Sequence, residues 1–367
     1  MKNMFITLLL LAVFLSGCAS GNQQNDSLPA EEKITAHPAV ADEPENNDSL
    51  SPEEKITDHP AIPDEPEKDE EAGDRNYQRE NGSVVYFTED ISPEGLLAVY
   101  QALGAEPQGR IAVKITTGEP PNSNYLKPEL IKDLVQSLDG TLVECNTAYG
   151  GRRGSNKYHM QVVEDHGFLD IATVDILDAD AEISLPVIGG EVLSENFVGA
   201  NFINYDYYVV LSHFKGHQMA GYGGAIKNIS IGIASKAGKI WIHSGGTRTS
   251  GGISGNQHDF LKSMAEAGKS VSDSLDGNIL YINVMNQLSI DCDCNGRPAE
   301  PDMHDVGILA SFDPVALDQA CIDLVAAAPD SETLMKRINQ QDGIITIIHA
   351  AGIGLGNREY TLVNIDD

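Results

Sequence analysis

Residues 207–228 read YYVVLSHFKGHQMAGYGGAIKN, an apolar run that passes directly into a polar, glycine-rich segment. Tyr207 to Leu211 is typical of a buried strand. Two histidines, two lysines and four glycines follow within Ser212–Asn228. Glycine lets backbone approach a ligand closely, histidine supplies a metal ligand or a proton, and lysine supplies a charge or a nucleophile. The segment therefore predicts a reaction centre or a metal site at the end of a buried strand.

Strand and helix patterns alternate on both sides of this segment. The expected strands cover residues 110–116, 141–146, 171–176, 207–211, 279–284 and 305–310. The expected helices cover residues 127–138, 156–166, 257–275, 314–327, 331–339 and 344–355. This alternation predicts an α/β fold with a largely parallel sheet flanked by helices, arranged as two lobes around a cleft. Ligands of such sheets bind beyond the carboxyl ends of the strands, where residues 212–224 are expected to lie.

Three titratable residues alternate directly after the central strand. If the chain stays extended through His213, Lys215 and His217, their side chains share one face. Two imidazoles and an ammonium group would then converge, and we take these residues as candidate catalytic groups. The alternative is a polar loop whose side chains are solvated.

A glycine cluster and a lysine follow these residues. Gly221, Gly223 and Gly224 precede a helix expected to start near Ala225, so they predict a turn that binds an anionic ligand. Lys227 lies just inside that helix, where its amine could face the same ligand. Turns also require glycine for purely structural reasons, and this alternative stays open.

Two neighbouring arginines lie on a second glycine loop, just past the strand that ends at Asn146. Arg152 and Arg153 follow Gly150 and Gly151. Guanidinium groups suit a carboxylate or a phosphate, so both are candidate substrate-binding residues. The alternative is an ordinary surface turn.

Histidine and cysteine provide candidate metal ligands farther along the chain. His243 follows two apolar residues in a strand-like run, where it is either a core residue or a ligand. Cys292 and Cys294 are separated by one residue, which is too close for an easy disulfide and suits thiolate ligation. Cys321 is a candidate third thiolate ligand, although its expected helix also suits a buried free cysteine.

The chain is strongly acidic, with a formal net charge of −31 at pH 7. This charge argues against nucleic acid and anionic lipid surfaces as partners. Small anionic ligands remain compatible with it, provided that local basic residues collect them.

The N-terminal segment predicts export. Residues 1–17 combine Lys2, an apolar run and small residues before Cys18, as in a secretory signal peptide. Leu15 to Cys18 resembles the bacterial lipobox, which implies cleavage before Cys18, lipidation of Cys18 and an extracytoplasmic, membrane-anchored protein. Residues 18–80 are expected to form a disordered tether: 26–47 and 48–69 are repeats with 15 of 22 positions identical, and residues 26–80 hold 18 acids against 5 bases. Residues 81–367 are expected to form the α/β domain.

Taken together, the motifs resemble a bacterial and archaeal family known as the domain of unknown function 362, whose members are often labelled iron–sulfur centre proteins. The resemblance lies in four segments: 125–128, 145–153, 213–235 and 291–328. Many members carry a ferredoxin-like insert after the segment that matches residues 241–243. Here residues 245–256 contain no cysteine, so ordinary cubane clusters cannot bind there.

A second resemblance lies in residue intervals. Members of the nickel-pincer lactate racemase family have a histidine, a glycine-rich turn, a lysine ten residues after the histidine and a second histidine sixteen residues farther on. His217, Lys227 and His243 keep these intervals. The resemblance implies an acid/base role for His217, attachment of a pyridinium-derived cofactor to Lys227, and nickel binding by His243. By the same analogy, Arg152 would hold a substrate carboxylate and His159 would be a second base.

The sequence leaves three hypotheses. The first is a metal- or cofactor-binding protein with redox or isomerase chemistry on a small anion, centred on the histidines and lysines of 213–243. The second is a solute-binding or sensory lipoprotein that captures an anion without chemistry. The third is a structural surface protein.

Overall fold

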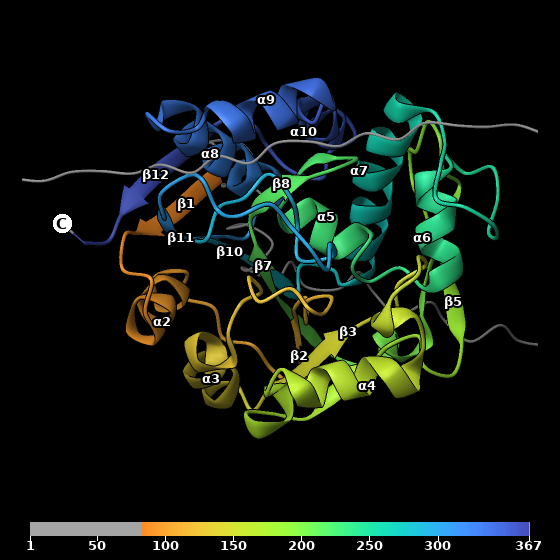
Figure 1. The fold of residues 1–367 in the computed structure, drawn as a ribbon, viewed down its shortest axis with the longest axis horizontal. Coiled ribbons are helices and arrows are strands. Elements are labelled where there is room, and N and C mark those ends of the chain that lie inside the picture. The colour runs from red at the N-terminus through yellow and green to blue at the C-terminus, as the bar shows by residue number, and fades with distance from the viewer. Residues whose placement is uncertain (1–82, 367) are drawn as a thin grey trace, which may run out of the picture. The chain divides into compact units, whose positions relative to one another are not determined.

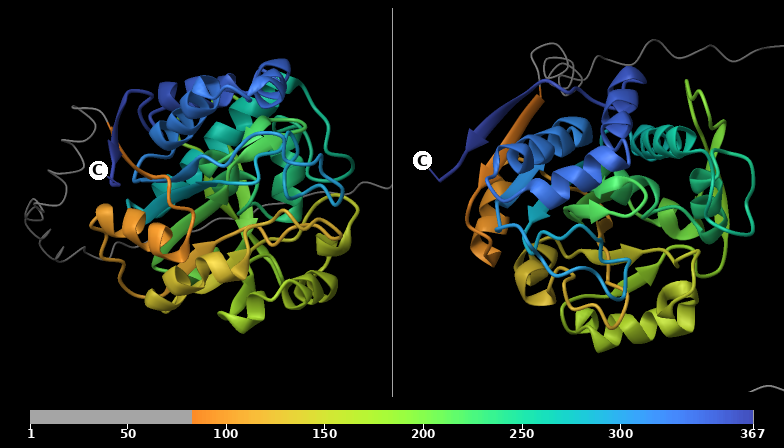
Figure 2. Two further views of the ribbon diagram at one scale, coloured as in Figure 1. Left: turned by 60° about the vertical axis from the view of Figure 1, so that its left-hand side comes forward. Right: turned by 45° about the horizontal axis from the view of Figure 1, so that its top comes forward.

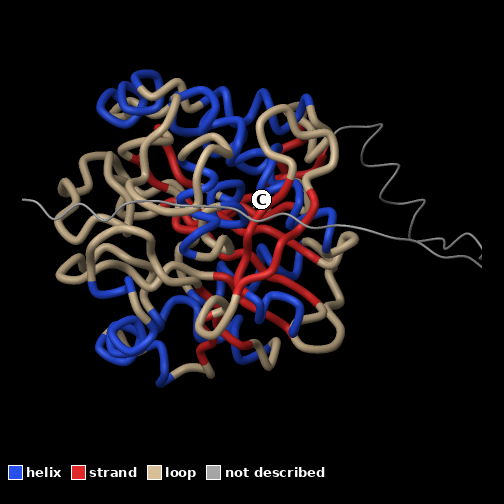
Figure 3. Tube along the Cα trace, turned by 90° about the vertical axis from the view of Figure 1, so that its right-hand side faces the viewer, coloured by secondary structure: helices blue, strands red, loops and turns tan. Residues whose placement is uncertain are grey.

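The computed structural model describes residues 83–366, so the expected signal peptide, lipidated Cys18 and repeated tether lie outside the described residues. An eight-stranded sheet forms the centre of the described part (Figures 1 and 3). Its strands, in spatial order, are β12 (Tyr360–Asn364), β1 (Ser83–Thr88), β11 (Gly307–Ser311), β10 (Ile279–Met285), β7 (Tyr207–His213), β2 (Ile111–Lys114), β3 (Thr141–Glu144) and β4 (Val174–Ile176).

All neighbouring strands in this sheet pair in parallel except at β11, which is antiparallel to both β1 and β10. Strand β7 lies in the middle, with β10 on one side and β2 on the other. The predicted α/β fold with a largely parallel sheet is therefore confirmed.

Helices cover both faces of the sheet (Figures 1 and 2). One face carries α2 (Pro93–Ala102), α3 (Pro128–Ser137) and α4 (Asn156–Asp165). The other carries α5 (Ala225–Ser230), α7 (Gln257–Ser274), α8 (Pro314–Ala327), α9 (Glu332–Gln340) and α10 (Ile344–Gly352). Helix α6 (Lys236–His243) packs against α7 in a smaller core. Within residues 83–366, no helix has the length and apolar character needed to span a membrane.

Successive side chains of β7 point to opposite faces of the sheet, and both faces are covered by helices, which explains why the strand is continuously apolar. Tyr208 and Val210 belong to the core under α5, whereas Tyr207, Val209 and Leu211 belong to the core under α3. A strand covered by helices on both faces has no solvated side, and the apolar run follows from that.

Some elements were not expected from the sequence. Strands β1 and β12, helix α2, and the antiparallel ribbons β5–β6 (Glu182–Pro186, Glu195–Gly199) and β8–β9 (Lys215–His217, Gly221–Gly223) were missed. Of the expected strand 171–176, only Val174–Ile176 form a strand, β4; a short 3-10 helix, Phe168–Asp170, precedes the remaining residues. His243 ends helix α6, so its expected strand-like run is wrong. The two-lobed arrangement is not confirmed.

Candidate functional site

A cavity of about 460 Å³ opens beyond the carboxyl ends of the parallel strands. Residues that follow β2, β3, β7 and β10 line it, together with α5 and α6. This is the place that the sheet topology predicts for a ligand. The cavity brings together three predicted site residues from the racemase-like intervals, namely His217, Lys227 and His243.

Lys227 points its amine into this cavity from α5. Among residues 83–366 the Lys227 amine makes no hydrogen bond and no ion pair. Burial, reinforced by the charge of Arg153, lowers the pKa of Lys227 to about 8. Gly223 lies against the lysine stem, where an added Cβ would come within 3.1 Å of the Lys227 Cδ atom. An unpaired amine with a lowered pKa is suited either to nucleophilic attack or to contact with an anion.

His217 reaches the cavity from β8, and backbone donors fix its tautomer. Its Nδ1 accepts hydrogen bonds from the N–H groups of Met219 at 3.2 Å and Ala220 at 2.9 Å. Burial holds the pKa of His217 well below its ordinary value, so the ring is neutral. Since Nδ1 is an acceptor, the proton lies on Nε2, and His217 offers the cavity an N–H donor.

His243 has the opposite tautomer. Its Nδ1 donates to the carbonyl oxygen of Lys239 at 2.6 Å, one turn back in α6. Burial lowers the pKa of His243 to about 4, and the ring stacks on Phe260 with centroids 4.6 Å apart. The free lone pair is therefore on Nε2, as a metal-binding imidazole requires, with its orientation fixed by a backbone carbonyl.

His213 and Lys215 form a separate buried cluster around Asp293. The His213 Nδ1 atom lies 2.9 Å from Asp293, and its Nε2 atom lies 2.8 Å from the Asn286 carbonyl oxygen. Lys215 Nζ lies 2.9 Å from the other Asp293 oxygen. Burial by itself raises the pKa of Asp293, but His213 and Lys215 lower it to about 2. These pairings leave neither side chain free for the predicted catalytic role, although Lys215 and His217 lie two residues apart on β8 and His213 lines the same cavity as His217.

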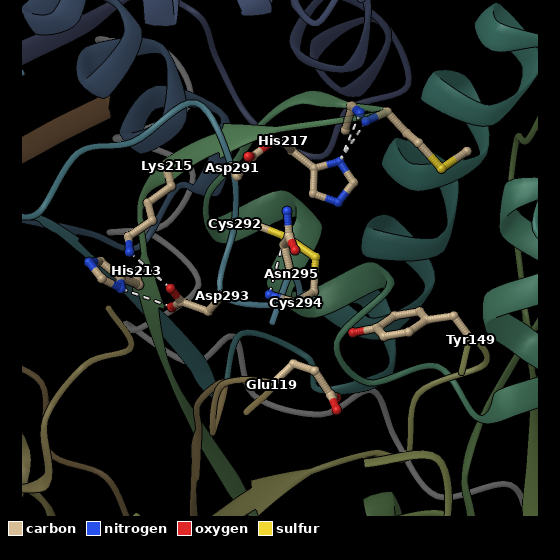
Figure 4. Close-up of a disulfide and its surroundings, with 12 residues drawn as sticks. Glu119, Tyr149, His213, Lys215, His217, Asp291, Cys292, Asp293, Cys294 and Asn295 are labelled. Carbon is tan, nitrogen blue, oxygen red and sulfur yellow. Dashed lines mark hydrogen bonds and ion pairs between the residues drawn. A yellow bond between two sulfur atoms is a disulfide. The ribbon is translucent and has the colours of Figure 1, made fainter. Parts of the chain in front are cut away.

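Cys292 and Cys294 form a disulfide on the cavity wall (Figure 4), which corrects the expectation of a free thiolate pair. The intervening Asp293 is anchored in the buried cluster, so the backbone folds sharply and brings the two Cα atoms to 5.3 Å. This separation is within the ordinary disulfide range. Cys321 lies apart from the pair: it is fully buried in the core on α8, where Asn283 donates to its sulfur at 3.4 Å.

The first N–H groups of α5, which follow the glycine turn, are bonded within the protein. The carboxylate of Asp318 accepts from the N–H groups of Ala225 at 2.7 Å and Ile226 at 3.0 Å. Gly224 lies so close to this carboxylate that an added Cβ would be 2.3 Å from its oxygen. An internal acid therefore occupies the start of α5, whereas Gly223 and Gly224 line the cavity, so the anion-binding role of Gly221, Gly223 and Gly224 stays a prediction.

The two arginines also differ from expectation. Arg153 is buried and contacts two carboxylates, Glu119 at 3.2 Å and Glu144 at 2.7 Å. Arg152 is exposed and pairs with Asp165 at 3.0 Å. Arg153 is thus neutralised within the protein, and Arg152 points to solvent, so neither provides a free guanidinium group for a substrate.

His159, the candidate second base, is tied into the same polar network. It is fully buried, with Nε2 3.1 Å from Glu144 and Nδ1 3.4 Å from Asn146. Its ring is not part of the cavity wall. It therefore supports Glu144 and does not reach a ligand in the cavity.

Two lysines that were not singled out from the sequence supply positive charge in or beside the cavity wall. Lys239 lines the cavity from α6, and its Nζ donates to the Ala234 carbonyl at 2.5 Å. Lys114, at the end of β2, donates to Asn228 at 2.9 Å, and burial lowers its pKa to about 8. Neither these two lysines nor Lys227 forms an ion pair within the described part of the chain. A lysine at the end of an apolar strand was the sequence signal for Lys114.

The sequence matches a known protein family over more than half of its length. Residues 111–323 match the family described as "Domain of unknown function (DUF362)". The chain belongs to this family. The match begins at β2 and ends in α8. It includes the cavity, the disulfide loop and every strand of the sheet except β1 and β12, and it confirms the predicted resemblance.

Solved structures add two distant neighbours. One is the lactate racemase apoprotein from Thermoanaerobacterium thermosaccharolyticum, at 10% identity and a TM-score of 0.41, covering 68% of this chain and 58% of that chain. The other is a protein from Thermotoga maritima, at 12% identity and a TM-score of 0.39, covering 64% and 58%. The chain thus spans less than two thirds of the length of either neighbour. No curated protein matches the chain.

Proposed function

We propose that the cavity binds a metal-containing cofactor together with a small anionic substrate, and that it supports redox or isomerase chemistry on that substrate. The observation that carries this proposal is the unpaired amine of Lys227, with a pKa of about 8, in a cavity shared with His217 and His243. A partly buried lysine amine without a partner costs stability. Such a group is typical of a functional site.

Lys227 and His243 fit the two attachments that such a cofactor needs. With a pKa of about 8, roughly a tenth of the Lys227 amine is neutral at pH 7 and can attack an electrophilic carbon. His243 offers a neutral Nε2 lone pair to a metal ion, and its Nδ1 bond to Lys239 holds the ring in that tautomer. Lys227 would hold the organic part, and His243 would hold the metal. The bound group would supply the electrophilic or redox centre.

His217 suits a different role from the acid/base function implied by the resemblance. To accept a proton at Nε2, the ring would need its other proton at Nδ1, where two backbone N–H groups already point. Instead, the neutral Nε2–H can donate to an oxygen of the substrate and stabilise negative charge that develops there.

The charge of the cavity favours an anionic substrate. Lys227 and Lys239 face the cavity without ion pairs, whereas its acids are paired: Asp291 with Arg337, Asp293 with Lys215, and Glu119 and Glu144 with Arg153. Local positive charge in a protein of net charge −31 would collect a small anion. The same lysines support the second candidate, a solute-binding protein that captures an anion without chemistry.

Export is part of the proposal. The apolar segment of residues 1–17 and the lipobox-like sequence ending at Cys18 support a lipoprotein anchored outside the cytoplasm. The mass of the N-terminal peptide tests this: a lipidated Cys18 is expected, and an intact residue 1–17 segment in the mature protein would contradict it.

Metal analysis of paired histidine variants tests the proposed function. We expect His243→Ala to bind at least tenfold less metal per chain than wild type, because it removes the imidazole with the free lone pair. His217→Ala is the matched control and should retain the metal, since its Nε2 carries a proton. Both variants should first be compared with wild type by thermal unfolding. Equal metal loss in both variants, or none in His243→Ala, would contradict the assignment.

A further inference from the structure

The disulfide is the one bonded cysteine pair within residues 83–366, and it faces the cavity (Figure 4). Cys292 and Cys294 are only partly buried, whereas Cys145 and Cys321 are buried free thiols. A small reagent that enters the cavity can therefore reach the bonded sulfurs but not Cys321, which lies in the core; Cys145 borders the cavity but is almost fully buried. This is the reverse of the usual arrangement for a structural disulfide enclosed in a core.

The surroundings stabilise negative charge on these sulfurs. The backbone N–H of Cys294 donates to the Cys292 sulfur at 3.3 Å. A ring nitrogen of His217 lies within 4.8 Å of both sulfurs. Figure 4 shows the Nδ1 of this ring turned to the backbone donors and the other nitrogen turned towards the disulfide. The Nε2–H of His217 is thus placed to donate to a thiolate.

Tautomer and charge distinguish this arrangement from a metal site. A metal ion held by His217 and the two sulfurs would need a lone pair on Nε2. Because Nδ1 accepts two hydrogen bonds, the ring proton is on Nε2 and no lone pair is available at that atom. An N–H donor instead favours a thiolate, as does the nearby Lys227 amine in the same cavity. Thiolates that receive hydrogen bonds and positive potential are better leaving groups in exchange reactions.

The loop that carries the pair is fixed on both sides. Asp291 pairs with Arg337 at 3.2 Å, and Asp293 is held by Lys215 and His213. These contacts do not depend on the S–S bond. When the bond opens, both sulfurs stay near each other, so re-formation remains an intramolecular reaction.

We propose that Cys292 and Cys294 are a redox-active pair that exchanges two electrons with a small dithiol. One thiolate of the dithiol attacks the Cys294 sulfur, the S–S bond breaks, and Cys292 leaves as a thiolate stabilised by its two N–H donors. The second thiol of the dithiol, once deprotonated, then displaces Cys294 and closes its own disulfide. The dithiol is oxidised, the pair is reduced, and the two protons of the dithiol pass to the cysteines or to solvent. This proposal does not rest on the proposed cofactor.

Equilibration in buffers of reduced and oxidised dithiothreitol tests it. The full chain is equilibrated under native conditions, free thiols are trapped with iodoacetamide, and labelled positions are located by peptide mass. We expect reversible labelling of Cys292 and Cys294 while Cys321, which lies in the core away from the cavity, stays unlabelled. His217→Ala is expected to shift the equilibrium constant about tenfold towards the disulfide, because a charge-assisted hydrogen bond is lost.

Two further variants separate this role from a loss of structure. His217→Gln keeps an N–H donor and should restore part of the shift. His258→Ala removes an exposed histidine that pairs with Asp342 and should leave the equilibrium unchanged. Resistance of the pair to excess dithiothreitol until the protein unfolds would overturn the proposal. An equilibrium constant for His217→Ala equal to that of wild type would also overturn it.

Discussion

Replacement of Lys227 by methionine is expected to stabilise the protein by on the order of 2–3 kcal/mol at pH 7. The native state holds the pKa of this amine near 8, whereas the unfolded chain has the ordinary value near 10.5. Below pH 8 the native state must bury the charged form, and that cost is present in full. Between pH 8 and 10.5 the unfolded state binds more protons, so the stability of the wild type rises with pH. Lys227→Met should remove this rise.

The same variant should also remove a reactive amine from the cavity. At pH 7 the neutral fraction of Lys227 is roughly a tenth, about a hundredfold or more above that of an exposed lysine. Reductive methylation with formaldehyde, which fits the cavity, followed by peptide mapping measures the rate at each lysine. Lys236→Met is the matched control, because Lys236 is exposed and bonds only the Gly154 carbonyl. Slow methylation of Lys227, together with destabilisation by Lys227→Met, would show that the amine has a structural partner.

Replacement of Arg153 by methionine is expected to destabilise the protein by about 3–5 kcal/mol. Burial alone would raise the pKa of Glu144, but Arg153 and His159 hold it well below its ordinary value. Without the guanidinium group, Glu144 and Glu119 lose their buried counter-charge. Chemical denaturation of the variant at pH 7 measures the loss.

Arg152→Met is the control for this prediction. Its exposed pair with Asp165 is expected to contribute only about 0–1 kcal/mol. A substrate-binding Arg153 would give the opposite pattern, with little change in the free energy of unfolding and a large loss of anion affinity. The pair of variants therefore decides between a structural and a ligand-binding role.

Much of the fold could be predicted because its signals are local. The apolar run of β7 and the Pro314 start of α8 are visible in short windows, and the helix 314–327 has the predicted bounds. The carboxyl ends of parallel strands lie at one edge of a sheet, and this rule predicted the position of the cavity. The ends of the sheet could not be predicted, since β1 pairs with β12 and β11 across more than two hundred residues.

The site could be predicted only where intervals along the chain carry it. His217, Lys227 and His243 do converge in the cavity, although His243 arrives on a helix. The sequence could not predict partners that are distant along the chain. Asp293 bonds Lys215, Asp318 accepts hydrogen bonds from the start of α5, and Glu119 pairs with Arg153. Pairing of this kind depends on the folded geometry, and composition alone made the same side chains look free.

The most direct test of the central claim is the intact mass and metal content of the protein purified from its native source, with peptide mapping around Lys227. We expect about one metal ion per chain and an added mass on the peptide that contains Lys227, both absent from Lys227→Met. A metal-free chain with an unmodified Lys227 would contradict the cofactor assignment and favour the anion-binding alternative.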